Sequence, residues 1–306
     1  MSITSPKVPI LARSTKDVTE PFFAFAARAP LNIAPERGGR LAAEIFGHGR
    51  WQLQPSQTAA NFYAVPPDKA IYLSYAGLAS LWCVAYAAFH VADIASQEQG
   101  RHNALGQGQI NIAQEFSSRK IPEHIAYAKT LFRADLDWPD DLPIPQPDPN
   151  FDSLEGRVNN VFYGALSWML LHEIAHVHHG DVKLIPADLL VRQEYRADDF
   201  ATRWILDDAG DGPYREFRVL MIVVALTWLF LHERTVGVSS DHPFAILRFR
   251  EAAAMFQMSD MSVGLENAAY ILKALLDPTT PAPPHDTAKE LFEWISDRLE
   301  TLFGTS

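Results

Sequence analysis

The spacing of apolar positions predicts a chain that is mostly helical from residue 152 onward. Helices are expected over 152–179, 187–208, 214–233, 244–258, 263–276 and 288–303, because apolar residues recur there every three or four positions. Asp152 and Glu155 resemble a capping pair at the start of the first of these helices. Gly180 is expected to end it.

The first half of the chain has weaker patterns. Residues 1–35 contain scattered prolines without a clear period, which predicts an irregular arm, and residues 36–47 suit a short helix. Between residues 61 and 74, the aromatic-rich runs NFYAV and AIYLS flank the turn PPDK, which is typical of a β-hairpin. Residues 77–92 have the composition of a helix, and 94–135 are helical and amphipathic in parts.

A proline-rich stretch separates these two halves. Residues 138–151 contain five prolines and cannot continue a helix, so we expect a loop there that forms the rim of a cleft. The predicted fold class is mainly α with a small β-hairpin or sheet (α+β). Residues 1–60 are expected to form an N-terminal arm with a short helix, and residues 61–306 a single structural unit.

Composition narrows the possible functions. The chain has 306 residues, of which 48% are hydrophobic and 21% charged, as in an ordinary globular protein. The net charge of −11 and the absence of Lys/Arg runs argue against a nucleic-acid partner. Cys83 is the single cysteine, which excludes an intramolecular disulfide and a multi-cysteine zinc site.

No segment has the length expected of a membrane span. The N-terminal residues lack the apolar core of a secretory signal. The apolar run 219–231 has thirteen residues and the uncharged run 77–92 has sixteen, whereas a span needs about 20. We therefore expect core helices in a soluble, cytoplasmic protein without a membrane span.

The sequence LLHEIAHVHHGD, residues 170–181, contains the pattern His-Glu-x-x-His. His172 and His176 are four residues apart, so on a helix both can present a ring nitrogen to one zinc ion. Glu173 lies about 100° round the helix, where its carboxylate can take a proton from a water that zinc activates. Its own face carries Leu166, Leu170 and Val177, where an uncompensated carboxylate would be costly.

The next predicted helix repeats this anomaly. Its apolar face contains Ala197, Ala201 and Trp204, and Glu194 and Asp198 are in register with it. Two carboxylates one turn apart repel each other in a core. They are explained if Glu194 is the third zinc ligand and Asp198 accepts a hydrogen bond from the outer nitrogen of a ligand histidine.

An alternative without a metal has to be weighed. His172 and His176 can be core histidines, with Glu194 and Asp198 on a solvated face. Any one of these residues alone favours that interpretation, but all of them at these offsets on consecutive helices, together with Glu173, favour a metal site. We interpret His178 and His179 as surface residues or as neighbours of the ligands.

These residues resemble a known family. HEIAHVHHG followed by EYRADDFA is similar to the gluzincin arrangement, in which the third ligand is the Glu of Glu-x-x-x-Asp. The apolar helix 219–231 and the sequence SSDHPFAILRFR resemble the phage-exclusion Lit-type peptidases. NFYAVPPDKAIYLSYAGL resembles, more distantly, the edge-strand segment of the HtpX/CAAX-prenyl-protease-type peptidases.

The resemblance implies a zinc-dependent endopeptidase (Zn²⁺) on a zincin-like helical core, with a protein or peptide substrate. It also implies that the strand ending near Ser74 aligns an extended peptide by edge pairing. The membrane helices of the HtpX-type proteins are missing here. The metzincin pattern would need Gly at His179 and His at Val182, so that subgroup is excluded.

Two further points remain open on the sequence alone. His242, in the turn SSDHP, is the best candidate for a donor to the oxyanion, with Tyr195 a weaker one; the alternative is that this turn only caps the helix that follows. A metal-binding interaction or regulatory protein without peptidase activity is the rival function, and a helical scaffold without metal is a third. The presence of Glu173 favours the enzyme, because a structural zinc needs no general base.

Overall fold

The protein is mainly helical, with one small sheet. The computed structural model describes residues 12–46, 51–103 and 111–304. The helices are α1 (Thr15–Ala26), α2 (Ala29–Ile33), α3 (Gly38–Arg40), α4 (Tyr75–Asn103), α5 (Ile112–Ser118), α6 (Ile121–Leu131), α7 (Leu154–His179), α8 (Ala187–Leu206), α9 (Pro213–Val236), α10 (Ala245–Ala253), α11 (Val263–Leu276) and α12 (Ala288–Phe303). Shorter turns are the 3-10 helices η1 (Pro35–Arg37) and η3 (Pro66–Asp68) and the π-helix η2 (Leu41–Phe46). The strands are β1 (Gln52–Ser56), β2 (Phe62–Val65) and β3 (Ala70–Ser74). The predicted fold class is confirmed.

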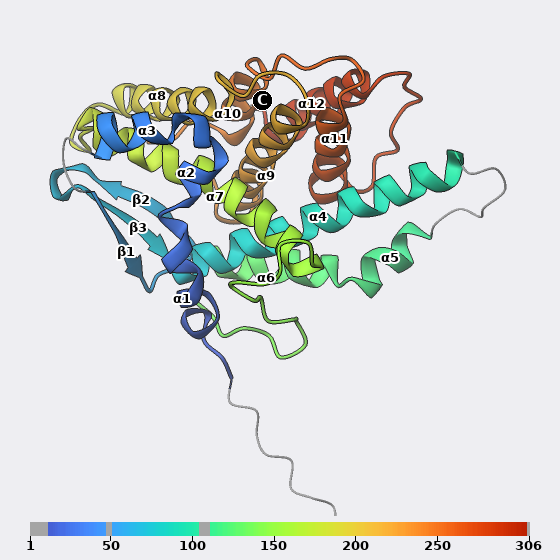
Figure 1. The fold of residues 1–306 in the computed structure, drawn as a ribbon, viewed down its shortest axis with the longest axis horizontal. Coiled ribbons are helices and arrows are strands. Elements are labelled where there is room, and N and C mark those ends of the chain that lie inside the picture. Colours follow the sequence, from blue (N-terminus) through green and yellow to red (C-terminus); the bar gives the residue numbers. More distant parts are fainter. Residues whose placement is uncertain (1–11, 47–50, 104–110, 305–306) are drawn as a thin grey trace, which may run out of the picture.

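Helix α7 runs through the centre of the molecule and contacts α2, α4, α8, α9 and strand β2 (Figure 1). Every residue from 164 to 175 is buried, as expected for a helix that is apolar on all sides. The Ser153 side chain caps its start by accepting from the Gly156 N–H, so the predicted Asp152–Glu155 pair was placed one residue too early. Gly180 ends the helix with a φ of 64°, as predicted.

Helices α4 and α9 are longer than their apolar runs suggested. Both contain 24-residue segments, Tyr75–Glu98 and Pro213–Val236, that could cross a membrane by length and composition alone. In this structure 72% and 61% of the apolar windows in these segments are buried inside the protein. Burial of this kind is typical of core helices in globular proteins.

The predicted hairpin is present, but the sheet has a third strand. Strand β2 pairs antiparallel with β3, and β1 pairs parallel with the other edge of β3. The strand that ends at Ser74 is therefore the central one, and it cannot offer an edge to a peptide as predicted. The Ser74 hydroxyl caps α4 by accepting from the Gly77 N–H and also bonds the backbone of Asn61, which fixes the start of β2.

The irregular arm predicted for residues 1–35 is wrong where the structure describes it. A capping box between Ser14 and Asp17 starts α1, and Val18, Phe22 and Ala26 form a buried stripe at the helical spacing. Helix α1 contacts α4 and α7, and α2 contacts α7. The scattered prolines on which that prediction rested do not exclude a helix here, since Pro21 lies inside α1. Residues 1–11 lie outside the described part.

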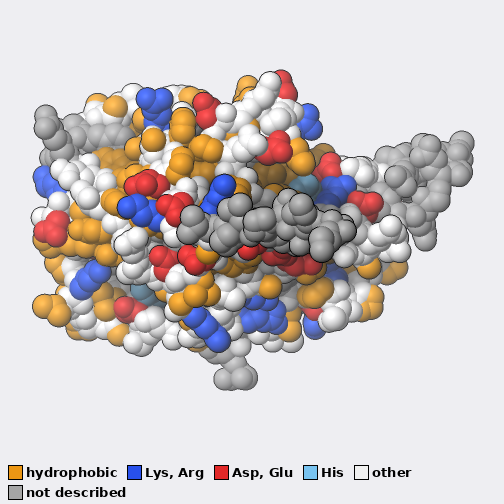
Figure 2. All heavy atoms as spheres, turned by 90° about the horizontal axis from the view of Figure 1, so that it is seen from below, with side chains coloured by type: hydrophobic (Ala, Val, Ile, Leu, Met, Phe, Trp, Pro, Cys, Tyr) orange, Lys and Arg blue, Asp and Glu red, His pale blue; other side chains and the backbone are white. Residues whose placement is uncertain are grey.

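Some of the remaining predicted elements agree with the structure and others differ from it. Residues 36–46 form η1, α3 and η2 instead of one short helix, α10 is shorter than predicted, and α11 and α12 have the predicted bounds. Residues 138–151 are a loop, as predicted. That loop packs against α4 and α6 through Trp138, whose ring contacts Trp82 and Tyr127. It does not line the cavity described below, so it does not form the rim of that cavity. On the face seen in Figure 2, acidic, basic and apolar side chains are interspersed.

Candidate metal centre

Two histidines on α7 meet at the C-terminal end of its buried stretch. His172 is 5% exposed and His176 is partly buried. Their spacing of four residues puts both rings on one side of the helix, and their Nε2 atoms lie 3.0 Å apart. Glu173, between them in sequence, is 7% exposed.

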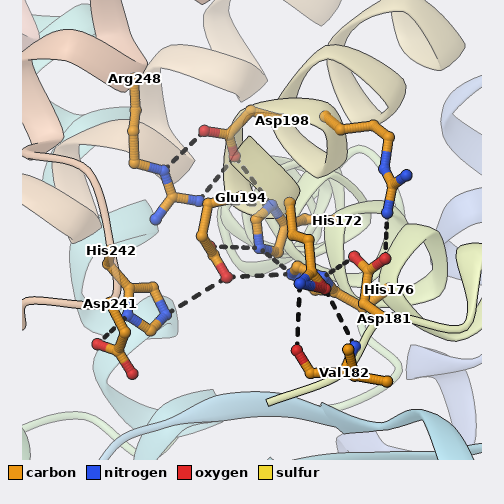
Figure 3. A network of polar contacts seen from close by, with 11 residues as sticks. His172, His176, Asp181, Val182, Glu194, Asp198, Asp241, His242 and Arg248 are labelled. Atoms are coloured by element: carbon orange, nitrogen blue, oxygen red, sulfur yellow. Dashed lines mark hydrogen bonds and ion pairs between the residues drawn. The ribbon is translucent and has the colours of Figure 1, made fainter. Parts of the chain in front are cut away.

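Helix α8 brings a carboxylate to the same point (Figure 3). Glu194 places Oε2 3.3 Å from His172 Nε2 and Oε1 3.3 Å from His176 Nε2. One ligand atom from each of these three residues lies within 4.8 Å of the other two. The structure thus brings together the three residues that the sequence predicted as a ligand set.

The outer nitrogens of both rings face carboxylates. His172 Nδ1 lies 2.9 Å from Asp198 Oδ1, which is the contact predicted for Asp198. His176 Nδ1 lies 2.8 Å from Asp181 Oδ2, a contact that the sequence analysis missed. Its one local signal is position, because Asp181 follows the glycine that ends α7.

A buried arginine completes the contacts of Asp198. Arg248 on α10 donates from Nε to Asp198 Oδ2 at 2.8 Å and from Nη2 to Oδ1 at 2.7 Å, and its guanidinium lies over the Trp168 ring at 5.7 Å. The sequence analysis also missed this residue. The signal was available, because Arg248 lies in register with the apolar residues Ala245, Phe249 and Ala252 of α10.

These contacts determine what the centre can hold. When both imidazoles are neutral, each Nδ1–H donates to its carboxylate, so the Nε2 lone pairs point at each other and at Glu194. Glu194 Oε2 is buried and forms no hydrogen bond. Three acceptors without a donor repel one another in a buried place, and a cation between them removes that repulsion. The donor set of two imidazoles and one carboxylate fits zinc.

The pKa shifts point to the same need for positive charge. Burial lowers the pKa of His172, but the Asp198 and Glu194 carboxylates outweigh it and raise this pKa to about 10. Burial raises the pKa of Glu194, but the two imidazoles outweigh it and hold this pKa far below its usual range. Burial also raises the pKa of Glu173.

A cavity of about 320 Å³ opens beside the three residues. Its lining includes Glu173, Glu194, His242, Phe62, Trp228 and Glu233. His242 is 48% exposed; its Nε2 lies 3.7 Å from Glu194 Oε1 and its Nδ1 lies 2.8 Å from Asp241 Oδ1. The side chains of the turn 239–243 do not cap α10, since the Glu233 carboxylate accepts from the first N–H of that helix, at Ala245.

Three other candidate residues lie elsewhere. Tyr195 lines a separate cavity between α8 and α10, with Asp198 and Glu251, and does not line the cavity that holds Glu173. His178 and His179 are exposed, and their rings contact Phe200 instead of the ligand group.

A comparison with known families gives a match to this chain. A family model described as Peptidase U49 matches residues 71–268, about two thirds of the chain. The chain belongs to the peptidase U49 family. The matched region of this U49 peptidase contains α7, α8 and α10, and with them every residue of the centre. No curated protein and no solved structure matches the chain. The peptidase part of the predicted function is thereby confirmed.

The buried Arg248–Asp198 pair gives a stability prediction for this U49 peptidase. Arg248→Met should lower the free energy of unfolding by about 3–5 kcal/mol, because it leaves the buried Asp198 carboxylate without its ion-pair partner. Arg250→Met is the matched control, since Arg250 lies on the same helix in an exposed pair with Glu300, and should cost about 1 kcal/mol or less. Urea unfolding in the presence of a chelator measures both. Equal losses in the two variants would show that the Arg248 pair contributes no more than a surface pair.

Proposed function

We propose that this U49 peptidase is a zinc-dependent endopeptidase of the gluzincin, Lit-like type. The observation that carries the proposal is the convergence of His172 Nε2, His176 Nε2 and the Glu194 carboxylate, which are three acceptors when both imidazoles are neutral. Membership of a peptidase family supplies the reaction class. Two histidines and one glutamate leave a position open on a four-coordinate metal, as in catalytic sites.

Each residue near the centre has a role in peptide hydrolysis. His172, His176 and Glu194 would hold the zinc, which when bound activates water and polarises the scissile carbonyl. Glu173 takes a proton from the attacking water and returns it to the leaving amine. Its burial in the wall of the cavity suits both steps, because a raised pKa brings a carboxylate closer to the operating pH.

The substrate reaches this cavity along the sheet. Strand β2 is an edge strand, and Asn61 and Phe62 at its start line the cavity. An extended peptide can add to such an edge through backbone hydrogen bonds. We assign to β2 the role that the sequence analysis gave to the strand ending at Ser74.

To His242 we assign the stabilisation of negative charge on the substrate. It lies in the same cavity as Glu173, and Asp241 bonds the far side of its ring. The Asp241 contact orients the ring so that Nε2 faces the centre, where the doubly protonated imidazolium can donate to the oxyanion while its Nδ1–H donates to Asp241. Tyr195 has no such position.

The class of substrate and the location of the protein in the cell are part of the same proposal. The substrate is a protein or peptide; a net charge of −11 disfavours nucleic acid. We assign α4 and α9 to the protein core, in a cytoplasmic protein that does not span a membrane, because most of their apolar windows are buried.

Metal content tests the centre directly. We expect about one zinc per chain, and loss of that zinc from His176→Ala, since a ligand is removed while the buried His172–Asp198–Arg248 contacts remain. His178→Ala is the matched control, because His178 is an exposed histidine on the same helix, and should keep its zinc. Elemental analysis of purified protein measures this. A protein without zinc that still cleaves peptides would contradict the proposal.

Glu173→Gln separates the enzyme from a metal-binding protein without activity. The variant should keep zinc and fold but lower peptide hydrolysis by roughly 10²–10⁴-fold, the usual loss on removing a general base. Glu155→Gln, an exposed position on the same helix, should cleave like the wild type. New protein N-termini in cells that express each variant give the readout. Undiminished cleavage in Glu173→Gln would assign the residue a structural role.

His242→Ala should keep zinc and lower turnover by roughly 10²–10³-fold, which is about 2.7–4 kcal/mol of transition-state stabilisation. The readout is turnover per folded molecule on a peptide substrate found by the N-terminus search. His285→Ala, an exposed histidine outside the centre, is the control. A variant that loses only thermal stability would return the turn to a purely structural role.

A further inference from the structure

The ring of His176 is oriented by different contacts from those that orient the ring of His172. The chain turns at Gly180, which has a φ of 64° and nothing within 4 Å of the place where a Cβ would lie. This turn lets the Asp181 N–H donate to the His176 carbonyl at 3.0 Å. The Asp181 carboxylate meets the His176 ring at 2.8 Å (Figure 3). Backbone and side chain of Asp181 are thus both bonded to the same ligand residue.

Helix α8 also contacts the segment that follows Gly180, through two of its side chains. Gln193 uses both ends of its amide, accepting from the Val182 N–H at 3.1 Å and donating to the Val182 carbonyl at 3.1 Å. Arg196 donates to the other oxygen of Asp181. These two residues flank Glu194 in the sequence, one before it and one two positions after it.

We propose that Asp181, Gln193 and Arg196 form a clasp that positions His176 and Glu194 for the metal. The inference rests on the proposed function, since it concerns the same centre. Asp181 holds the ring of His176 with Nε2 turned inward, and the contacts of Gln193 and Arg196 fix the turn of α8 that carries Glu194 against the end of α7. The ligands from the two helices are then in register before any metal arrives.

The two ends of the clasp contribute unequally. The Asp181 side chain is 8% exposed and contacts a ligand directly, whereas the Arg196 side chain is 49% exposed. Loss of a carboxylate that orients a ligand histidine typically costs 10–100-fold in metal affinity. An exposed ion pair typically contributes less than about 1 kcal/mol, which is about fivefold in affinity. Asp181 is therefore the stronger part of the clasp.

The test is the zinc affinity of the purified full chain, measured by competition with a chromophoric chelator. Asp181→Ala should bind zinc roughly 10–100-fold more weakly. Asp181→Asn should recover part of that loss, because its amide oxygen still accepts from His176 Nδ1–H. Arg196→Met should lose about fivefold or less. Arg203→Met is the matched control, since Arg203 pairs with Asp199 on the exposed side of the same helix, and should match the wild type.

A second readout separates positioning from general stability. Cobalt in place of zinc reports coordination geometry through its visible absorption, which should change in Asp181→Ala and stay wild-type in Arg203→Met. Wild-type zinc affinity and cobalt absorption in Asp181→Ala would overturn the clasp while leaving the metal centre intact. A loss that Asp181→Asn does not recover at all would also overturn it. If the wild-type chain binds neither metal, the proposed function fails and the clasp falls with it.

Discussion

When both imidazoles are neutral, the repulsion among three converging acceptors is the constraint on which the rest of the centre depends. The Nε2 atoms of His172 and His176, 3.0 Å apart, and the carboxylate of Glu194 converge in a largely buried place beside the cavity. In a low-dielectric place this repulsion is strong, because screening is weak. A fold that keeps these groups together has to hold them from outside. The contacts around the centre do this: each imidazole is bonded through its outer nitrogen to an aspartate, and each aspartate is bonded to an arginine.

The two aspartate–arginine pairs differ in how deeply they are buried, so the two halves of the centre differ in how they are held in place. Asp198 and Arg248 are buried beside Trp168 and link α7, α8 and α10. Asp181 and Arg196 lie where α7 ends and the chain turns toward α8, with the arginine half exposed. Salt screens an exposed pair and leaves a buried one largely unaffected. The His172 side of the centre is thus part of the core, and the His176 side depends on a surface turn.

Whether a feature could be predicted from the sequence depends on how far apart in the chain the residues that form it lie. The histidine pair is local to one helix, and Glu194 and Asp198 are marked by their register with apolar neighbours, so all four were found. Arg248 meets Asp198 from a helix fifty residues further on, and no local pattern indicates which carboxylate it meets. Strand β1 was missed because QLQPS has a proline and too little alternation, and its parallel pairing with β3 is not local. That pairing also covers the outer edge of β3, which a two-stranded hairpin would leave free, so of these two strands only β2 keeps a free edge.

The shape of the centre bears on the choice between an enzyme and a structural metal site. A structural zinc is usually closed by four protein ligands, and among the described residues three form the ligand group. His172 and Glu194 also line a cavity whose lining includes Glu173 and His242, and neither of these two belongs to the ligand group. Glu173 belongs neither to the ligand group nor to an ion pair among the described residues, and burying such a carboxylate lowers the stability of the fold. A role in proton transfer gives Glu173 a reason to stand in the wall of that cavity, which is why the geometry favours catalysis over a purely structural metal.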